Sequence, residues 1–183
     1  MRLRAIVLTS LAAISHAQDF TDTYLYVSPT ESQTPVQVQL DFFTATKLNG
    51  SDAIFIQLPK FTIGAGGKTP GAHVPRNHLL ISPATLFEGQ WIEGDFNSVE
   101  DPFRNSTLVL WVKEQVEIPA GTSIKARVYA SNGVVVYCGF DRADNTEEDE
   151  YAMWANSSFA SAARVPIEHS GRVGNRCASI PDC

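Results

Sequence analysis

Two acidic side chains follow a tryptophan in the stretch FEGQWIEGDF, residues 87–96. Carbohydrate sites combine an aromatic ring, on which a sugar can stack, with polar groups that bind its hydroxyls. Glu93 and Asp95 would share one face of a strand about 7 Å apart, a spacing that glycosidases also use for their two carboxylates. The stretch therefore predicts sugar binding by Trp91, Glu93 and Asp95, or hydrolysis by the two acids. The alternative is that the acids form a solvated strand face and Trp91 lies in the core.

A second stretch, residues 53–87, is free of acids and contains Lys60, Lys68 and Arg76. In an acidic protein such a stretch predicts an anion contact, either with an acidic polysaccharide or with the acidic loop of another copy. The alternative is a long solvated loop between strands.

The sequence GAGGKT at residues 64–69 lies inside this cationic stretch and resembles a phosphate-binding loop. That loop requires a glycine where Thr62 stands, and a helix after the lysine. Pro70 and Pro75 would interrupt such a helix, because each removes a backbone donor and clashes with the preceding turn. Nucleotide binding is therefore excluded.

The run DRADNTEEDE, residues 141–150, has six acids and one arginine. Its calcium candidates are Asp144, Glu147 and Asp149, although their spacing does not fit the EF-hand loop. A solvated acidic loop is the simpler interpretation, because charge runs usually stay in water.

Other catalytic patterns are missing, since neither a GxSxG elbow nor HExxH nor CxxC occurs. One enzymatic alternative remains. If a leader were cleaved after Ser15, His16 would become the first residue, and secreted copper oxygenases of sandwich fold hold copper with an N-terminal histidine and a second one. Cleavage after Ala17 fits the small-residue rule better, so we expect no metal and no cofactor.

Residues 1–17 have the layout of a secretory signal, with two arginines ahead of a short apolar stretch. Cleavage would remove two of the fourteen basic residues and none of the twenty acidic ones, which lowers the formal charge from −6 to −8. This charge disfavours nucleic acid as a partner. No later apolar run is long enough for a membrane span, so we expect a secreted, extracellular protein.

Three cysteines and three glycosylation sequons fit an oxidising, secretory route. With Cys138, Cys177 and Cys183, one thiol is left over if two pair. We favour a bridge from Cys138 to one of the terminal two; a small terminal ring, a bond between two chains and a buried free Cys138 stay open. The candidate glycan acceptors are Asn49, Asn105 and Asn156.

The elements that must position all these residues are strands. Apolar residues alternate with polar ones in the segments 36–43, 52–58, 107–112 and 123–129. Further strands are expected from Thr23, His78 and Val134 onward, and around Phe159 and Val165. Gly, Asn and Pro punctuate the connections LNGSD, IPAGT and SNGV.

Seven to nine short strands of this kind predict an all-β fold, an antiparallel β-sandwich of Ig-like or jelly-roll type, with a barrel as the alternative. The segment 151–164 could supply one short helix, although its Asn and Ser content disfavours this. We expect a signal over residues 1–17, one domain over 18–170, and a tail over 171–183 with two cysteines.

Several motifs also resemble a β-rich extracellular repeat of large secreted or surface proteins of algae and related protists. The shared stretches are VQVQLDFFTATKLNGSDAIFIQLPKFT, GQWIEGD, STLVLWVKEQVEIPAGTSIKARV and SFASAARVPIEHSGRVG. They cover most of the chain after the signal. The resemblance implies a sandwich fold and an extracellular setting, and it carries over no catalytic residues.

Together these features predict a secreted, non-enzymatic module for adhesion or assembly in a cell wall, surface appendage or matrix. Its partners would be an extracellular glycan or protein, with further copies of itself among the candidates. The alternative is a polysaccharide-active enzyme, either a glycosidase that uses Glu93 and Asp95 or a copper oxygenase that begins at His16.

Overall fold

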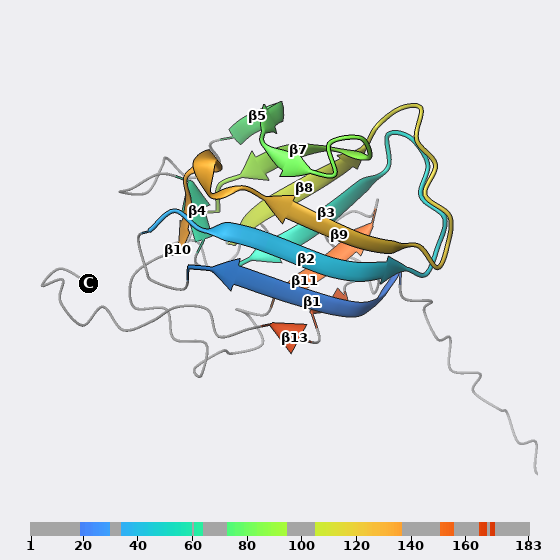
Figure 1. Ribbon diagram of the computed structural model, residues 1–183, viewed down its shortest axis with the longest axis horizontal. Helices are drawn as coiled ribbons and strands as arrows, with labels where there is room; N and C mark the ends of the chain where they lie inside the picture. The colour runs from blue at the N-terminus through green and yellow to red at the C-terminus, as the bar shows by residue number, and fades with distance from the viewer. Residues whose placement is uncertain are drawn as a thin grey trace, which may run out of the picture.

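The alternating segments form strands that pair into two main sheets (Figure 1). The computed structural model describes residues 19–29, 34–59, 61–63, 73–94, 105–136, 151–155, 165–167 and 169–170. Among these residues the helical content is a single 3-10 turn, η1 (Ala130–Asn132).

The first sheet has five strands, and the tyrosines of the N-terminal strand lie on it. Its order is β13 (His169–Ser170), β1 (Phe20–Ser28), β2 (Gln37–Thr44), β9 (Ser123–Val128) and β6 (Ile81–Ser82). All neighbours pair antiparallel except β13, which runs parallel to β1.

The second sheet has six strands and is antiparallel throughout. Its order is β12 (Val165–Pro166), β11 (Ala152–Ala155), β3 (Ala53–Leu58), β8 (Ser106–Val112), β7 (Phe87–Ile92) and β5 (His73–Leu79). A separate pair joins β10 (Val134–Val136) to β4 (Phe61–Ile63).

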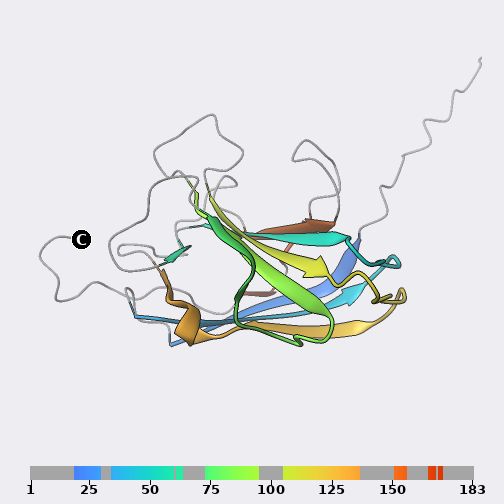
Figure 2. The ribbon, with the colours of Figure 1, turned by 90° about the horizontal axis from the view of Figure 1, so that it is seen from above.

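The two main sheets lie face to face as layers (Figure 2). Successive side chains of a strand point to opposite faces, so the apolar set of each strand enters the space between the layers. On β2, for example, Val38, Leu40 and Phe42 are each 1% exposed. Phe42 packs edge-to-face on Phe20, with ring centroids 5.3 Å apart. On the other face of the first sheet, the described outward side chains of β1, β2 and β9 are half-buried or exposed.

In two connections between strands, the backbone conformation or close packing requires particular residues. In the connection between β2 and β3, the Asn49 backbone N–H donates to Asp52 Oδ2 at 2.6 Å. Gly50 packs so closely on the backbone carbonyl of Glu114 that any Cβ would overlap it. Between β8 and β9, Gly121 has φ 77°, a conformation that favours glycine.

The all-β sandwich predicted from the alternation is confirmed. The described residues contain thirteen strands, more than expected, because several have only two or three residues. The helix considered for residues 151–164 is wrong at its start, where β11 pairs with β3. All four β11 residues are buried, so tertiary pairing outweighs the helix propensity of alanine there. In the part of the chain that is described, no helix has the length and apolar character of a membrane span.

Candidate functional site: the exposed face of the five-stranded sheet

The large apolar side chains that remain exposed among the described residues belong to strands of the five-stranded sheet or to residues next to them. They are Tyr26, Phe43, Leu80 and Tyr129, which are 47%, 40%, 60% and 40% exposed. Each lies next to core residues along its strand or just beyond it, so alternation turns it to the outer side of the five-stranded sheet. Apolar groups gathered on one face typically mark a binding surface, whereas scattered ones need no explanation.

Strand register brings polar side chains between these apolar ones. Tyr26 on β1 lies opposite Gln39 on β2, which lies opposite Arg127 on β9. The next outward row runs from Tyr24 through Asp41 to Lys125. The pairs between β2 and β9 are far apart in sequence, so only the sheet completes the rows.

Hydrogen bonds hold the middle of this surface in place. Gln39 Nε2 donates to Asp41 Oδ1 at 2.9 Å, and Arg127 Nε donates to Gln39 Oε1, also at 2.9 Å. Lys125 Nζ lies 3.7 Å from Asp41 Oδ2. A ligand that uses these groups therefore meets side chains that are already ordered, which lowers the entropy cost of binding.

The two tyrosine rings of β1 are also ordered relative to each other. The Tyr24 and Tyr26 rings are parallel to within 6°, with centroids 6.3 Å apart. We call the whole surface the tyrosine face and define it by its outward side chains: Tyr24, Tyr26, Gln39, Asp41, Phe43, Leu80, Lys125, Arg127 and Tyr129. Four strands at about 4.8 Å spacing make it about 14 Å wide, and the segment from Gln37 to Phe43 makes it about 20 Å long.

The residues predicted from FEGQWIEGDF lie elsewhere. Trp91 is 1% exposed and belongs to the core, and Glu93 is 2% exposed. Trp91 Nε1 donates to Glu93 Oε2 at 2.7 Å, and the Ile63 backbone N–H donates to the same oxygen at 3.2 Å. Asp95 lies outside the described residues. Trp91 therefore lies in the core, as the alternative interpretation had it. Glu93 is buried beside Trp91 and does not lie on a solvated strand face.

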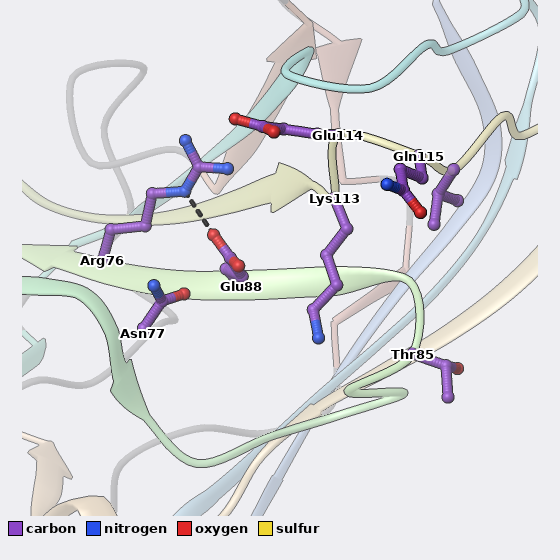
Figure 3. A pocket seen from close by; sticks show the side chains of 8 residues that line it. Arg76, Asn77, Thr85, Glu88, Lys113, Glu114 and Gln115 are labelled. Carbon is purple, nitrogen blue, oxygen red and sulfur yellow. Dashed lines mark hydrogen bonds and ion pairs between the residues drawn. The ribbon is translucent and has the colours of Figure 1, made fainter.

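Arg76 is the described member of the predicted cationic set, because Lys60 and Lys68 lie outside the described residues. It belongs to β5 in the six-stranded sheet. Its Nε donates to Glu88 Oε2 at 2.5 Å, and its guanidinium lies 5.0 Å from the centre of the Trp111 ring (Figure 3). Its charge is thus already paired, which weakens the argument for a free anion site at this position.

The remaining predicted sites are only partly described. The calcium candidates Asp144, Glu147 and Asp149, the cysteines and His16 fall outside the described residues. Within the described ranges no three His, Cys, Asp or Glu side chains gather as metal ligands. Of the sequons, Asn49 is exposed and Asn105 is 6% exposed, whereas Asn156 is not described. A glycan acceptor has to face solvent, a condition that Asn49 meets and the buried Asn105 does not, and glycosylation of the three sequons stays a prediction.

Sequence reasoning missed the tyrosine face, although a signal was present. In FTDTYLYVS the apolar Leu25 and Val27 alternate with Tyr24 and Tyr26. Once the aliphatic residues are assigned to the core, the tyrosines must face outward. Two aromatic rings left on the solvent side of one strand could have been noted as a candidate surface.

Comparison with known proteins adds one structural similarity. No family model and no curated protein matches this sequence, so the resemblance to the algal repeat stays a prediction. Among solved structures, the chain is similar to CBM3b of the major scaffoldin subunit ScaA from Acetivibrio cellulolyticus, with a TM-score of 0.43 and 10% sequence identity. The match covers 74% of this chain and 90% of that chain. At this level it says nothing about the ligand of the present chain.

Proposed function

We propose that this protein is a non-enzymatic extracellular module that binds polysaccharide on the tyrosine face. The observation that carries the proposal is the gathering of all the exposed large apolar side chains of the described residues around a fixed polar centre. The secretory signal predicted from the sequence supports the extracellular setting.

The chemistry of the face suits a sugar chain. One side of a pyranose ring is lined by C–H groups, which pack on aromatic rings, while its edge carries hydroxyls that both donate and accept. Tyr26 offers a half-exposed ring, beside which the Tyr24 ring stacks. Arg127 and Lys125 offer donors, and Asp41 offers acceptors. A flat face about 14 by 20 Å has room for several sugar units in contact with these groups.

Catalysis is disfavoured at the residues considered for it. A glycosidase needs one carboxylic acid and one carboxylate that both reach the substrate. Glu93 is buried and accepts two hydrogen bonds from the protein. Among the described residues that define it, the tyrosine face has a single carboxylate at its centre, Asp41, whereas a glycosidase needs two.

The test is a depletion assay with a panel of insoluble polysaccharides, in which free protein is measured after the solid is removed. We expect wild type to be depleted by at least one of them, and the double variant Tyr24→Ala/Tyr26→Ala to stay in solution. Lys47→Ala is the matched surface control, because Lys47 forms an exposed ion pair with Glu117 and is not one of the residues that define the tyrosine face. Its depletion should equal that of wild type.

Two other results would contradict the proposal. If no polysaccharide depletes the wild type but the protein self-associates, and the double variant is monomeric, the face is an interface between copies. If product sugars appear and persist in the double variant, the protein is an enzyme acting at another site.

A further inference from the structure

A polar groove lies on the six-stranded sheet. It has a volume of 680 Å³, within the usual range of small-ligand sites, and runs between β5, β7 and the segment that follows β8 (Figure 3). We call it the Arg76 groove. The side chains that the argument uses are Arg76, Thr85, Glu88, Lys113, Glu114 and Gln115. Leu80, at the edge of the tyrosine face, lines a smaller hollow beside this groove together with Asn77, Glu88 and Lys113.

Hydrogen bonds and a ring contact hold the side chains along one wall of this groove in place. Arg76 is held between the Glu88 carboxylate and the face of the Trp111 ring. With its amide nitrogen turned to Glu88, Asn77 donates to both carboxylate oxygens at 2.9 and 3.0 Å. Trp111 is fixed in turn, because its Nε1 donates to Gln90 Oε1 at 2.9 Å. Only Nε of Arg76 is used by a described residue, so its terminal nitrogens stay available to a ligand.

The other wall carries side chains that have no polar partner in the described part of the chain: Thr85, Lys113, Glu114 and Gln115. The Lys113 side chain extends along the groove beside Glu88 (Figure 3). Together the two walls present donors from Arg76 and Lys113, acceptors from Glu88 and Glu114, and an amide that does both.

Charge selects among the ligands that could use these groups. The two cations and the two carboxylates cancel, so the groove favours neither an anion nor a cation. A hydroxyl group both donates and accepts, and a row of hydroxyls therefore matches alternating donors and acceptors. The Trp111 ring is covered by Arg76, so hydrogen bonding rather than stacking would dominate here, in contrast to the tyrosine face.

From this arrangement we propose that the Arg76 groove is a second carbohydrate site, which takes one uncharged sugar chain. One molecule then joins a soluble chain in the groove to a polysaccharide held on the tyrosine face. The joining half of this proposal rests on the proposed function of the tyrosine face.

The experiment measures capture in two steps with the full chain. The protein is first bound to the insoluble polysaccharide that depletes it, and the washed solid is then incubated with fluorescent neutral oligosaccharides or with a uronic acid oligomer. We expect the coated solid to retain a neutral oligosaccharide above the level of the bare solid. Lys113→Ala should lower retention about tenfold, because a hydrogen bond to a charged donor is lost. Lys47→Ala should leave it unchanged.

Titration of the same oligosaccharide in solution provides the second readout. Tyr24→Ala/Tyr26→Ala should bind the oligosaccharide like wild type, although it no longer coats the solid, whereas Lys113→Ala should bind the solid but not the oligosaccharide. This double dissociation is the signature of two separate sites.

The possible failures are distinguishable. If wild type coats the solid but retains no neutral oligosaccharide, the groove proposal is overturned while the function of the tyrosine face stands. If the oligosaccharide releases the protein from the solid, one chain occupies both surfaces and the joining role is overturned. Stronger, salt-sensitive retention of the uronic acid oligomer would show that the groove selects anions instead. If nothing coats the solid, the proposed function fails, and joining fails with it.

Discussion

Glu93 offers the sharpest test of whether a residue singled out by its sequence context supports the fold or contacts a ligand. Its Oε2 accepts from Trp91 Nε1 at 2.7 Å and from the Ile63 backbone N–H at 3.2 Å. Trp91 is 1% and Ile63 6% exposed. In Glu93→Ala both donors would therefore lose their acceptor in a place that water does not reach.

The size of the effect follows from these two bonds. Leaving one buried donor unpaired costs about 1–3 kcal/mol, so two would cost about 2–6 kcal/mol. Removing a buried carboxylate offsets part of this, because Oε1 has no hydrogen-bond partner in the described structure and its desolvation cost disappears. We expect a net loss of about 2–4 kcal/mol, which lowers Tm by about 5–15 °C in a protein of this size.

Glu93→Gln is the matched variant. Its carbonyl oxygen can take the place of Oε2 and accept from both donors, while the charge is removed. Its amide nitrogen takes the place of the unpartnered Oε1 and becomes a buried donor, which offsets the gain from removing the charge. We therefore expect Glu93→Gln to lose about 1–2 kcal/mol, less than Glu93→Ala. Urea unfolding of the full chain, followed by tryptophan fluorescence, measures both variants.

Two outcomes would refute the reasoning. If Glu93→Ala is as stable as wild type, the two hydrogen bonds do not support the fold. If Glu93→Gln stays folded but no longer binds polysaccharide, Glu93 contacts the ligand, as FEGQWIEGDF first suggested.

Three further predictions concern exposed or tightly packed positions. Gly50→Ala should lower the free energy of unfolding in urea by about 1–3 kcal/mol, because the new Cβ meets the Glu114 carbonyl. Wild-type stability would show that the backbone of this turn can shift to make room for the Cβ. Tyr26→Ala should weaken polysaccharide binding about 8- to 30-fold, because about 50–80 Å² of the half-exposed ring contributes about 25 cal/mol per Å². Tyr26→Phe should bind nearly like wild type, and an equal loss in both variants would assign the effect to the hydroxyl. Lys47→Ala should change the free energy of unfolding by less than about 0.5 kcal/mol, since the ion pair of Lys47 with Glu117 is exposed. A larger loss of stability in thermal unfolding would contradict this.

Individual strands show how much of the fold can be predicted from the sequence. The alternation in VQVQLDFF by itself determines that Val38, Leu40 and Phe42 point one way and Gln39 and Asp41 the other, because the two-residue period is a local property of an extended chain. The same rule turns the tyrosines of β1 away from the core. Fold class and the buried set followed from this local rule.

The tertiary structure alone decided which outward side chains become neighbours. Arg127 reaches Gln39 across 88 positions of sequence, because β9 pairs with β2 in one particular register. A shift by one residue would turn every side chain of the strand to the other face, and no local pattern specifies the partner strand. Trp91 shows the same limit. The sequence FEGQWIEGDF allows the ring on either face of β7, and it became a core residue because that face of the six-stranded sheet is covered by the five-stranded one.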